Sequence, residues 1–140
     1  MTSRLPGFAV VGAIGFIVDA GILTLLMTGF GLDHYTARAV SFTVAVTVTW
    51  YLNRRWVFNR HAVPMSRREY LSYVAVQVIG SLINLAVFVA AIELIAGLER
   101  IPVIPLAMGA LVALLFNFGA SRRFVFADSD ARRATGEPRT

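Results

Sequence analysis

Two short stretches, Asn-Arg-Arg-Trp-Val-Phe at residues 53–58 and Ser-Arg-Arg-Phe-Val-Phe at residues 121–126, have nearly the same sequence. They lie 68 positions apart, and each follows a long apolar segment. The similarity extends to the segments before them, where Gly15 and Gly80 are matched at a spacing of 65. These matches indicate two copies of one unit, each of which ends in a pair of arginines.

The composition is typical of a membrane protein. The chain has 140 residues, of which 57% are hydrophobic and 15% are charged, whereas a soluble domain carries roughly 25% charged residues. Four apolar segments are each close to the ~20 residues that an α-helix needs to cross a bilayer. These segments are residues 7–30, 36–53, 70–96 and 101–121. The sequence therefore predicts an all-α integral membrane four-helix bundle.

Short links between the segments predict two antiparallel helix hairpins. Because each hairpin contains two spans, both copies would point the same way through the membrane, as parallel repeats do. We expect residues 1–126 to form one transmembrane domain. Residues 127–140 are polar and lack large apolar side chains, which predicts a disordered cytoplasmic tail.

The basic residues are unevenly distributed along the chain. All 13 are arginine, and only Arg38 and Arg100 fall near the ends that would face outward. An excess of arginine at one face follows the positive-inside rule. It predicts a multi-pass protein of the cytoplasmic (inner) membrane with both termini in the cytoplasm. This orientation accounts for the net charge of +5 without a nucleic-acid partner.

Two arginine pairs, Arg54 with Arg55 and Arg122 with Arg123, end the second and fourth spans. One interpretation is that they only anchor these helices at the cytoplasmic face. The other is that they bind a lipid phosphate, because guanidinium binds phosphate in a bidentate manner and basic pockets at this face recognise lipid headgroups. Both interpretations place the arginines among membrane lipids.

Small and polar residues recur every four positions in the same two spans. Towards the cytoplasmic ends they include Thr49 and Asn53 in one span and Asn117 and Ser121 in the other. Such a face can be a packing seam, because small residues let helices approach closely in lipid. It can also be a polar path along which a headgroup moves.

Asp19 lies well inside the first span. A carboxylate there costs about 2.5–3.5 kcal/mol on insertion scales, so it needs a partner, a proton or water. Arg38, at the outer start of the second span, is the candidate partner. The two interpretations are a structural ion pair and a site that couples movement to a proton or a substrate. At a spacing of 65, Asn84 replaces the carboxylate.

The residues that catalysis requires are not found in a recognisable arrangement. The chain has no cysteine and two histidines, His34 and His61, which are isolated in predicted loops. No serine, histidine and aspartate set, glycine-rich nucleotide loop or metal-ligand spacing occurs. We therefore expect a protein that is not an enzyme and uses neither a cofactor nor a metal.

Three motifs resemble those of the GtrA-like family. They are Phe-x3-Gly-x2-Gly at residues 8–15, Tyr-Leu-Asn-Arg-Arg-Trp-Val-Phe at residues 51–58, and Asn-Phe-x2-Ser-Arg-Arg-Phe-Val-Phe at residues 117–126. The resemblance covers nearly the whole chain. It implies a small four-span protein of cell-surface polysaccharide synthesis that helps to move polyprenyl-phosphate-linked sugars across the membrane. Other members of the family anchor or recruit membrane glycosyltransferases.

From their chemistry and positions, we expect specific roles for the candidate residues in such a protein. The four arginines would bind the phosphate, the four polar residues of the two spans would bind sugar hydroxyls, and Asp19 with Arg38 would form an outer gate. The alternative function is a non-transporting anchor or scaffold for a glycosyltransferase, and four helices are few enough to suggest a homo-oligomer. A small drug–proton exporter ranks third. Such proteins carry a glutamate in the first span and often show a weak charge bias, whereas this chain has Asp19 there and a strong bias.

Overall fold

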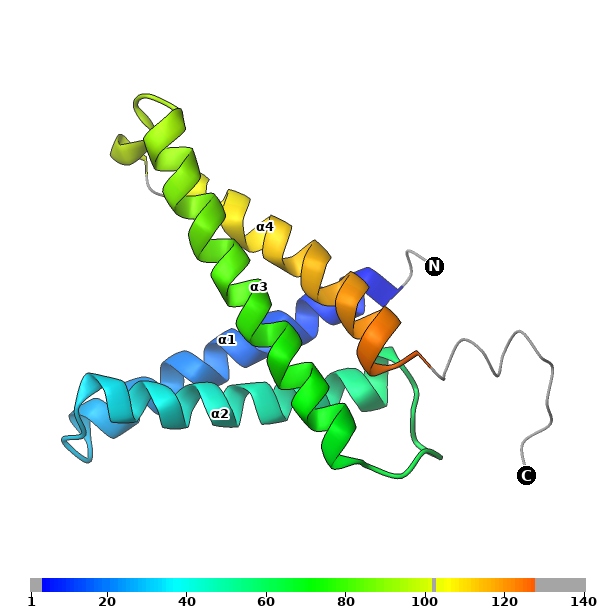
Figure 1. The fold of residues 1–140 in the computed structure, drawn as a ribbon. Coiled ribbons are helices and arrows are strands. Elements are labelled where there is room, and N and C mark those ends of the chain that lie inside the picture. The colour runs from blue at the N-terminus through cyan, green and yellow to red at the C-terminus, as the bar shows by residue number, and fades with distance from the viewer. Residues whose placement is uncertain (1–3, 102, 128–140) are drawn as a thin grey trace. The chain divides into compact units, whose positions relative to one another are not determined.

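The computed structural model describes residues 4–101 and 103–127. These residues form four α-helices, as the sequence predicts (Figure 1). The helices are α1 (Leu5–Thr28), α2 (His34–Leu52), α3 (Arg67–Leu94) and α4 (Val103–Ala120). The prediction of an all-α protein is therefore confirmed. The predicted disordered tail falls, from residue 128 onward, outside the described residues.

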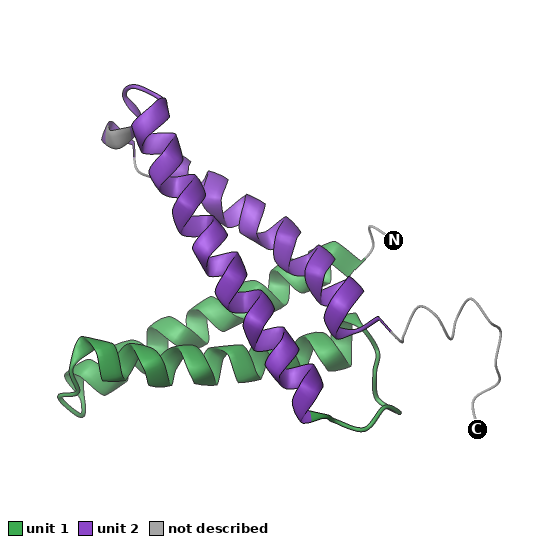
Figure 2. Ribbon diagram, viewed as in Figure 1, with its two compact units in different colours: residues 1–66, 128–140 green, residues 67–127 purple. Residues whose placement is uncertain are grey.

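The helices pack in pairs. α1 packs along α2 in a first hairpin, and α3 packs along α4 in a second. The chain divides into two compact units at the same place, between Ser66 and Arg67 (Figure 2). Each unit therefore buries its own helix–helix interface.

Within the described residues, three helices are long and apolar enough to cross a membrane: Leu5–Thr28, Arg67–Leu94 and Val103–Val125. The fourth predicted span, residues 36–53, corresponds to α2, which is less apolar because it carries Arg38 and several threonines. These hydroxyls are satisfied within the helix. Thr43 Oγ1 donates to a carbonyl one turn back at 2.7 Å, and Thr47 Oγ1 does the same at 2.8 Å. A membrane position for α2 therefore leaves neither hydroxyl without a partner.

The outer faces of the three apolar helices are rich in large hydrophobic side chains. Phe16 on α1, Leu82 on α3 and Leu111 on α4 are all more than half exposed. Water-soluble monomers rarely expose contiguous apolar patches of such extent. These faces are suited to contact with lipid chains.

Both hairpins end in a π-helical turn, Asn53–Val57 after α2 and Ser121–Val125 after α4. In each turn, the N–H of the following phenylalanine, Phe58 or Phe126, donates to the carbonyl of the first turn residue at 2.9 Å. This bond spans five residues instead of four and widens the backbone by one residue. The turn therefore changes which side chains face the hairpin and which face away.

The phenylalanine after each π-helical turn packs onto the first helix of the same hairpin. The ring centroids of Phe58 and Phe8 are 6.4 Å apart, and those of Phe126 and Tyr73 are 6.1 Å apart. All four side chains are buried. This aromatic contact fixes each turn against its own hairpin.

Asp33 caps the N-terminus of α2. Its Oδ2 accepts hydrogen bonds from the backbone N–H groups of Tyr35 and Thr36, both at 3.0 Å. Hydrogen bonding by the Thr36 side chain, followed by that of its backbone N–H, holds the pKa of Asp33 below its ordinary value of 3.8. A capping carboxylate satisfies N–H groups that the first helical turn leaves free.

The cap predicts a specific acid dependence. Because the pKa of Asp33 is lowered in the folded protein, its contribution to stability is complete above the ordinary pKa and is lost as the pH falls through the folded value. Asp33→Asn should keep a cap but remove this dependence. Thermal unfolding followed by circular dichroism from about pH 7 to about pH 3 measures it. Identical acid profiles for the variant and the wild type would contradict the assignment.

Candidate functional site

Arg54 lies in the first π-helical turn and is buried. Its Nη1 donates to the carbonyl of Arg60 at 2.9 Å, its Nη2 donates to the carbonyl of Val63, and its own carbonyl accepts from the N–H of Arg60 at 3.0 Å. Arg54 thus binds the backbone of the loop that follows the turn. The sequence predicts a phosphate-binding role for this residue, but its guanidinium is engaged by the protein itself.

Arg55, the second arginine of the pair, is exposed. Its Nη1 donates to the hydroxyl of Tyr51 at 2.8 Å, and its guanidinium carbon lies 5.8 Å from the centroid of the Tyr51 ring. The neighbouring Trp56 is 62% exposed. The first hairpin therefore presents one cation against the exposed Tyr51 ring, with a second exposed aromatic residue next to it in sequence, the composition found at membrane interfaces.

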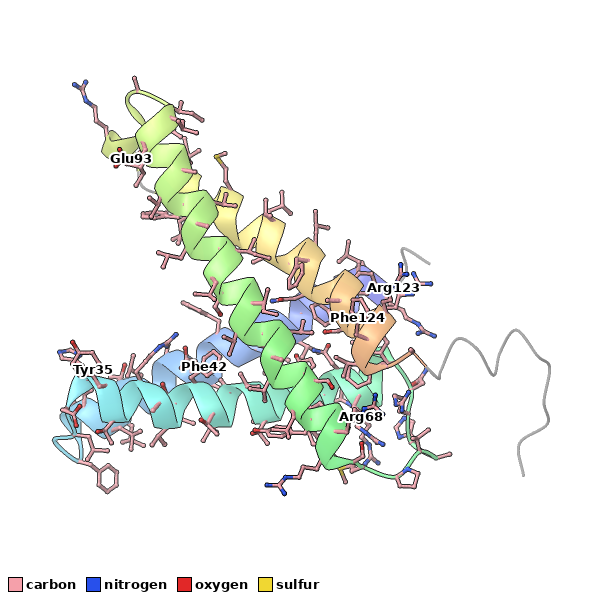
Figure 3. The ribbon with its side chains drawn as sticks, viewed as in Figure 1. Tyr35, Phe42, Arg68, Glu93, Arg123 and Phe124 are labelled. Carbon is pink, nitrogen blue, oxygen red and sulfur yellow. The ribbon has the colours of Figure 1, made fainter. Side chains whose placement is uncertain are left out.

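The second hairpin repeats this arrangement in part. Arg122 is half-buried, whereas Arg123 is exposed and its guanidinium carbon lies 5.9 Å from the centroid of the exposed Phe124 ring. Figure 3 shows Arg123 and Phe124 at the end of α4, with Arg68 at the same end of this hairpin and Glu93 at the opposite end. The second hairpin is thus basic at one end.

A polar contact joins the two helices of the second hairpin. Asn117 Nδ2 donates to Gln77 Oε1 at 3.2 Å. The Asn117 side chain occupies the space beside Gly80, so that a methyl group at Gly80 would overlap it. One turn and more away, the Asn84 side chain packs against Gly109 in the same way. Two asparagines thus fill two glycine positions, one in each direction across the interface.

The corresponding contact in the first hairpin is between Gly15 and Thr49, whose methyl group occupies the space that a side chain at residue 15 would need. Thr49 Oγ1 donates to the carbonyl of Val46 at 3.0 Å. Asn53 and Ser121 are also buried. The residues that the sequence predicts as a headgroup path therefore lie in closely packed surroundings, which agrees with the packing-seam interpretation.

The structure brings Asp19 and Arg38 together in a salt bridge between Asp19 Oδ2 and Arg38 Nη1. The Asp19 side chain is 17% exposed and that of Arg38 is 55% exposed. Asp19 is therefore the anion of an ion pair. Among the described residues, no three histidine, aspartate or glutamate side chains gather closely enough to hold a metal ion.

Sequence reasoning did not identify Tyr51 as a site residue, whereas for Gln77 it predicts an interhelical hydrogen bond, which the contact with Asn117 confirms. Tyr51 precedes Arg55 by four positions, a spacing that brings two side chains together on a helix, so a signal was present. The partner of Gln77 gave no such signal, since Asn117 is distant in the chain. Arg54 is buried and Arg55 is exposed, and both lie in a π-helical turn, which residue spacing does not reveal.

The chain matches one family of membrane domains. The model of the GtrA/DPMS transmembrane domain matches residues 7–126, which include both π-helical turns and all of both hairpins except the first two residues of α1. Members of the GtrA family are small membrane proteins, generally not catalytic, that are linked to cell-surface polysaccharide synthesis. The resemblance noted in the sequence is confirmed: this multi-pass membrane protein belongs to the GtrA/DPMS transmembrane-domain family.

Proposed function

We propose that the protein assists the movement of polyprenyl-phosphate-linked sugars across the cytoplasmic membrane during cell-surface polysaccharide synthesis. The observation that carries the proposal is the exposed arginine beside an exposed aromatic ring at the end of each hairpin, Arg55 with Tyr51 and Arg123 with Phe124. An arginine offers a phosphate several N–H donors in a planar fork. An aromatic ring at the membrane interface would keep the arginine at the depth of the lipid headgroups.

The proposal includes four membrane spans, arranged as two parallel copies of one hairpin with both termini in the cytoplasm. The distribution of arginines supports this orientation. Matched contacts support the repeat: Gly15 packs against Thr49 in one hairpin and Gly80 against Asn117 in the other. The internal hydroxyl bonds of α2 support its place as the second span.

The roles of the arginines follow from their exposure. Arg55 and Arg123, which are exposed, would bind the lipid phosphate directly, and the half-buried Arg122 would add to the positive charge. Arg54 would support the site by holding the adjacent loop through the Arg60 carbonyl. The isoprenoid chain would stay in the lipid.

The polar residues have roles that require movement. Thr49 and Asn117, together with Asn53 and Ser121, would bind sugar hydroxyls when the helices of a hairpin separate, since they are packed in the present arrangement. The ion pair of Asp19 and Arg38 would close the outer end of the first hairpin.

A scaffold for a membrane glycosyltransferase is the second candidate. The observation that favours it is the close packing of the predicted path, in which Thr49 fills the space at Gly15 and Asn117 fills the space at Gly80. A protein that only anchors an enzyme has no need of an open polar path. The large exposed apolar faces could equally contact another membrane protein or a second copy of the chain.

Transfer in liposomes separates these functions and gives a direct prediction. The purified protein should move a polyprenyl-phosphate sugar faster than empty liposomes do. Combined Arg55→Gln and Arg123→Gln should slow transfer by roughly tenfold or more, since a hydrogen bond to a charged group contributes about 1.5–3 kcal/mol. Arg100→Gln is the matched control, because Arg100 is an exposed arginine near the predicted outer face.

Two results would count against the proposal. Unchanged transfer by the double variant would exclude the arginines as the phosphate site. Absence of transfer by folded, correctly inserted wild-type protein would favour the scaffold function, and co-purification with a glycosyltransferase would then be the next measurement.

A further inference from the structure

We propose that Tyr51 and Arg55 form one preorganised binding site for the phosphate of a polyprenyl-phosphate lipid, and that the first hairpin therefore binds this phosphate more tightly than the second. The inference rests on the proposed function and adds to it a residue, Tyr51, and an order of affinity between the two hairpins. The ligand it names is a polyprenyl-phosphate lipid.

The two side chains are brought together where α2 changes into the π-helical turn. Tyr51 lies near the end of α2 and Arg55 lies within the turn. The Arg55 Nη1 donates to the Tyr51 hydroxyl at 2.8 Å, and the guanidinium carbon lies 5.8 Å from the ring centroid. Both side chains are nevertheless accessible, since Tyr51 is 41% exposed. The arginine is thus oriented without being buried.

Tyr51 and Arg55 together retain hydrogen-bond donors that an anion could accept. The Tyr51 oxygen accepts one N–H from Arg55, but no described residue accepts the proton of the Tyr51 hydroxyl. A guanidinium has five N–H donors, of which this contact uses one. A phosphate beside the pair would accept from both the hydroxyl and the guanidinium. Because Arg55 is already held by Tyr51, binding would order fewer side-chain rotamers.

The second hairpin lacks the tyrosine. At the spacing of 68 that relates the two hairpins, Arg123 corresponds to Arg55, but Gly119 corresponds to Tyr51. A side chain at Gly119 would meet no atom within 4 Å of its Cβ. Arg123 is accompanied by the Phe124 ring, which has no hydroxyl to donate. Because of this difference, the hydroxyl can be removed from the first hairpin and added to the second.

The test is equilibrium binding of a polyprenyl monophosphate, without a sugar, to the full chain in phosphatidylcholine nanodiscs. Tyr51→Phe removes one hydroxyl from an exposed position and should weaken binding by roughly tenfold. Gly119→Tyr should strengthen the weaker of two binding events, because it supplies the missing hydroxyl beside Arg123. Arg100→Gln should bind as the wild type does, and equal helix content by circular dichroism establishes folding.

The possible outcomes are distinct. Wild-type affinity for Tyr51→Phe would overturn the inference, as would wild-type affinity for Arg55→Gln. Complete displacement of the lipid by millimolar inorganic phosphate would identify a free phosphate as the ligand and overturn the lipid assignment. Transfer in liposomes distinguishes the binding site from the translocation function. If Tyr51→Phe loses affinity for the lipid but the wild type transfers no lipid, the binding site is supported and translocation is excluded.

Discussion

Replacing Gly80 with leucine is expected to separate α3 from α4 and to unfold the second hairpin. A Cβ at Gly80 would overlap the side chain of Asn117. The asparagine would have to leave this space and its 3.2 Å hydrogen bond with Gln77. Overpacking typically costs about 1–3 kcal/mol, and the lost interhelical bond adds roughly 0.6 kcal/mol in a membrane. Leucine should fall at or above the upper end of this range.

Unfolding of the purified protein in mixed micelles, followed by helix content, measures the loss. Gly12→Leu is the matched control, since a Cβ at Gly12 on α1 would meet no atom within 4 Å. Combining Gly80→Ala with Asn117→Ala should recover part of the stability that Gly80→Ala alone removes, because the second change vacates the occupied space. Equal stability of Gly80→Leu and Gly12→Leu would contradict the close approach of the two helices.

The second large effect is expected at the ion pair of α1 and α2. Arg38→Leu would leave Asp19, which is 17% exposed, without its cation inside a span. A carboxylate in that position costs about 2.5–3.5 kcal/mol, so we expect a loss of that order. Asp19→Asn should cost far less, because Arg38 is 55% exposed and a long arginine side chain can extend to the interface.

Unfolding measurements on both single variants and the double variant test this asymmetry. The double variant should be more stable than Arg38→Leu alone, since it removes the unpaired charge along with the cation. The second hairpin provides a natural comparison, because it carries Asn84 in place of Asp19. Single effects that are equal, and that add in the double variant, would show that the two side chains do not stabilise each other.

Much of the fold could be predicted from the sequence because lipid imposes simple requirements. An apolar run of about 20 residues predicts a helix in a membrane protein, and α1, α3 and α4 occur where such runs are found. The pairing of Asp19 with Arg38 was open to prediction for a related reason. A charge inside a span has few available partners, and Arg38 was the one near enough.

The π-helical turn that carries the arginine site could not be predicted, since one backbone hydrogen bond distinguishes it from an α-helix. In the π-helical turn at Asn53–Val57, the N–H of Phe58 bonds to a carbonyl five residues back. No pattern of apolar residues distinguishes this bond from that of an ordinary helix. The prediction from sequence therefore gave Arg54 and Arg55 the same role, whereas Arg54 is buried and Arg55 is exposed.

The burial of Arg54 has a consequence for the loop that it binds. A loop close to a membrane must satisfy its carbonyl groups where water becomes scarce. The Arg54 guanidinium donates to the carbonyls of Arg60 and Val63. At these two carbonyl groups it replaces the hydrogen bonds that water would otherwise donate. Two carbonyl groups of the loop between α2 and α3 therefore keep their hydrogen bonds without water, whereas an unsupported loop would have to turn them toward solvent.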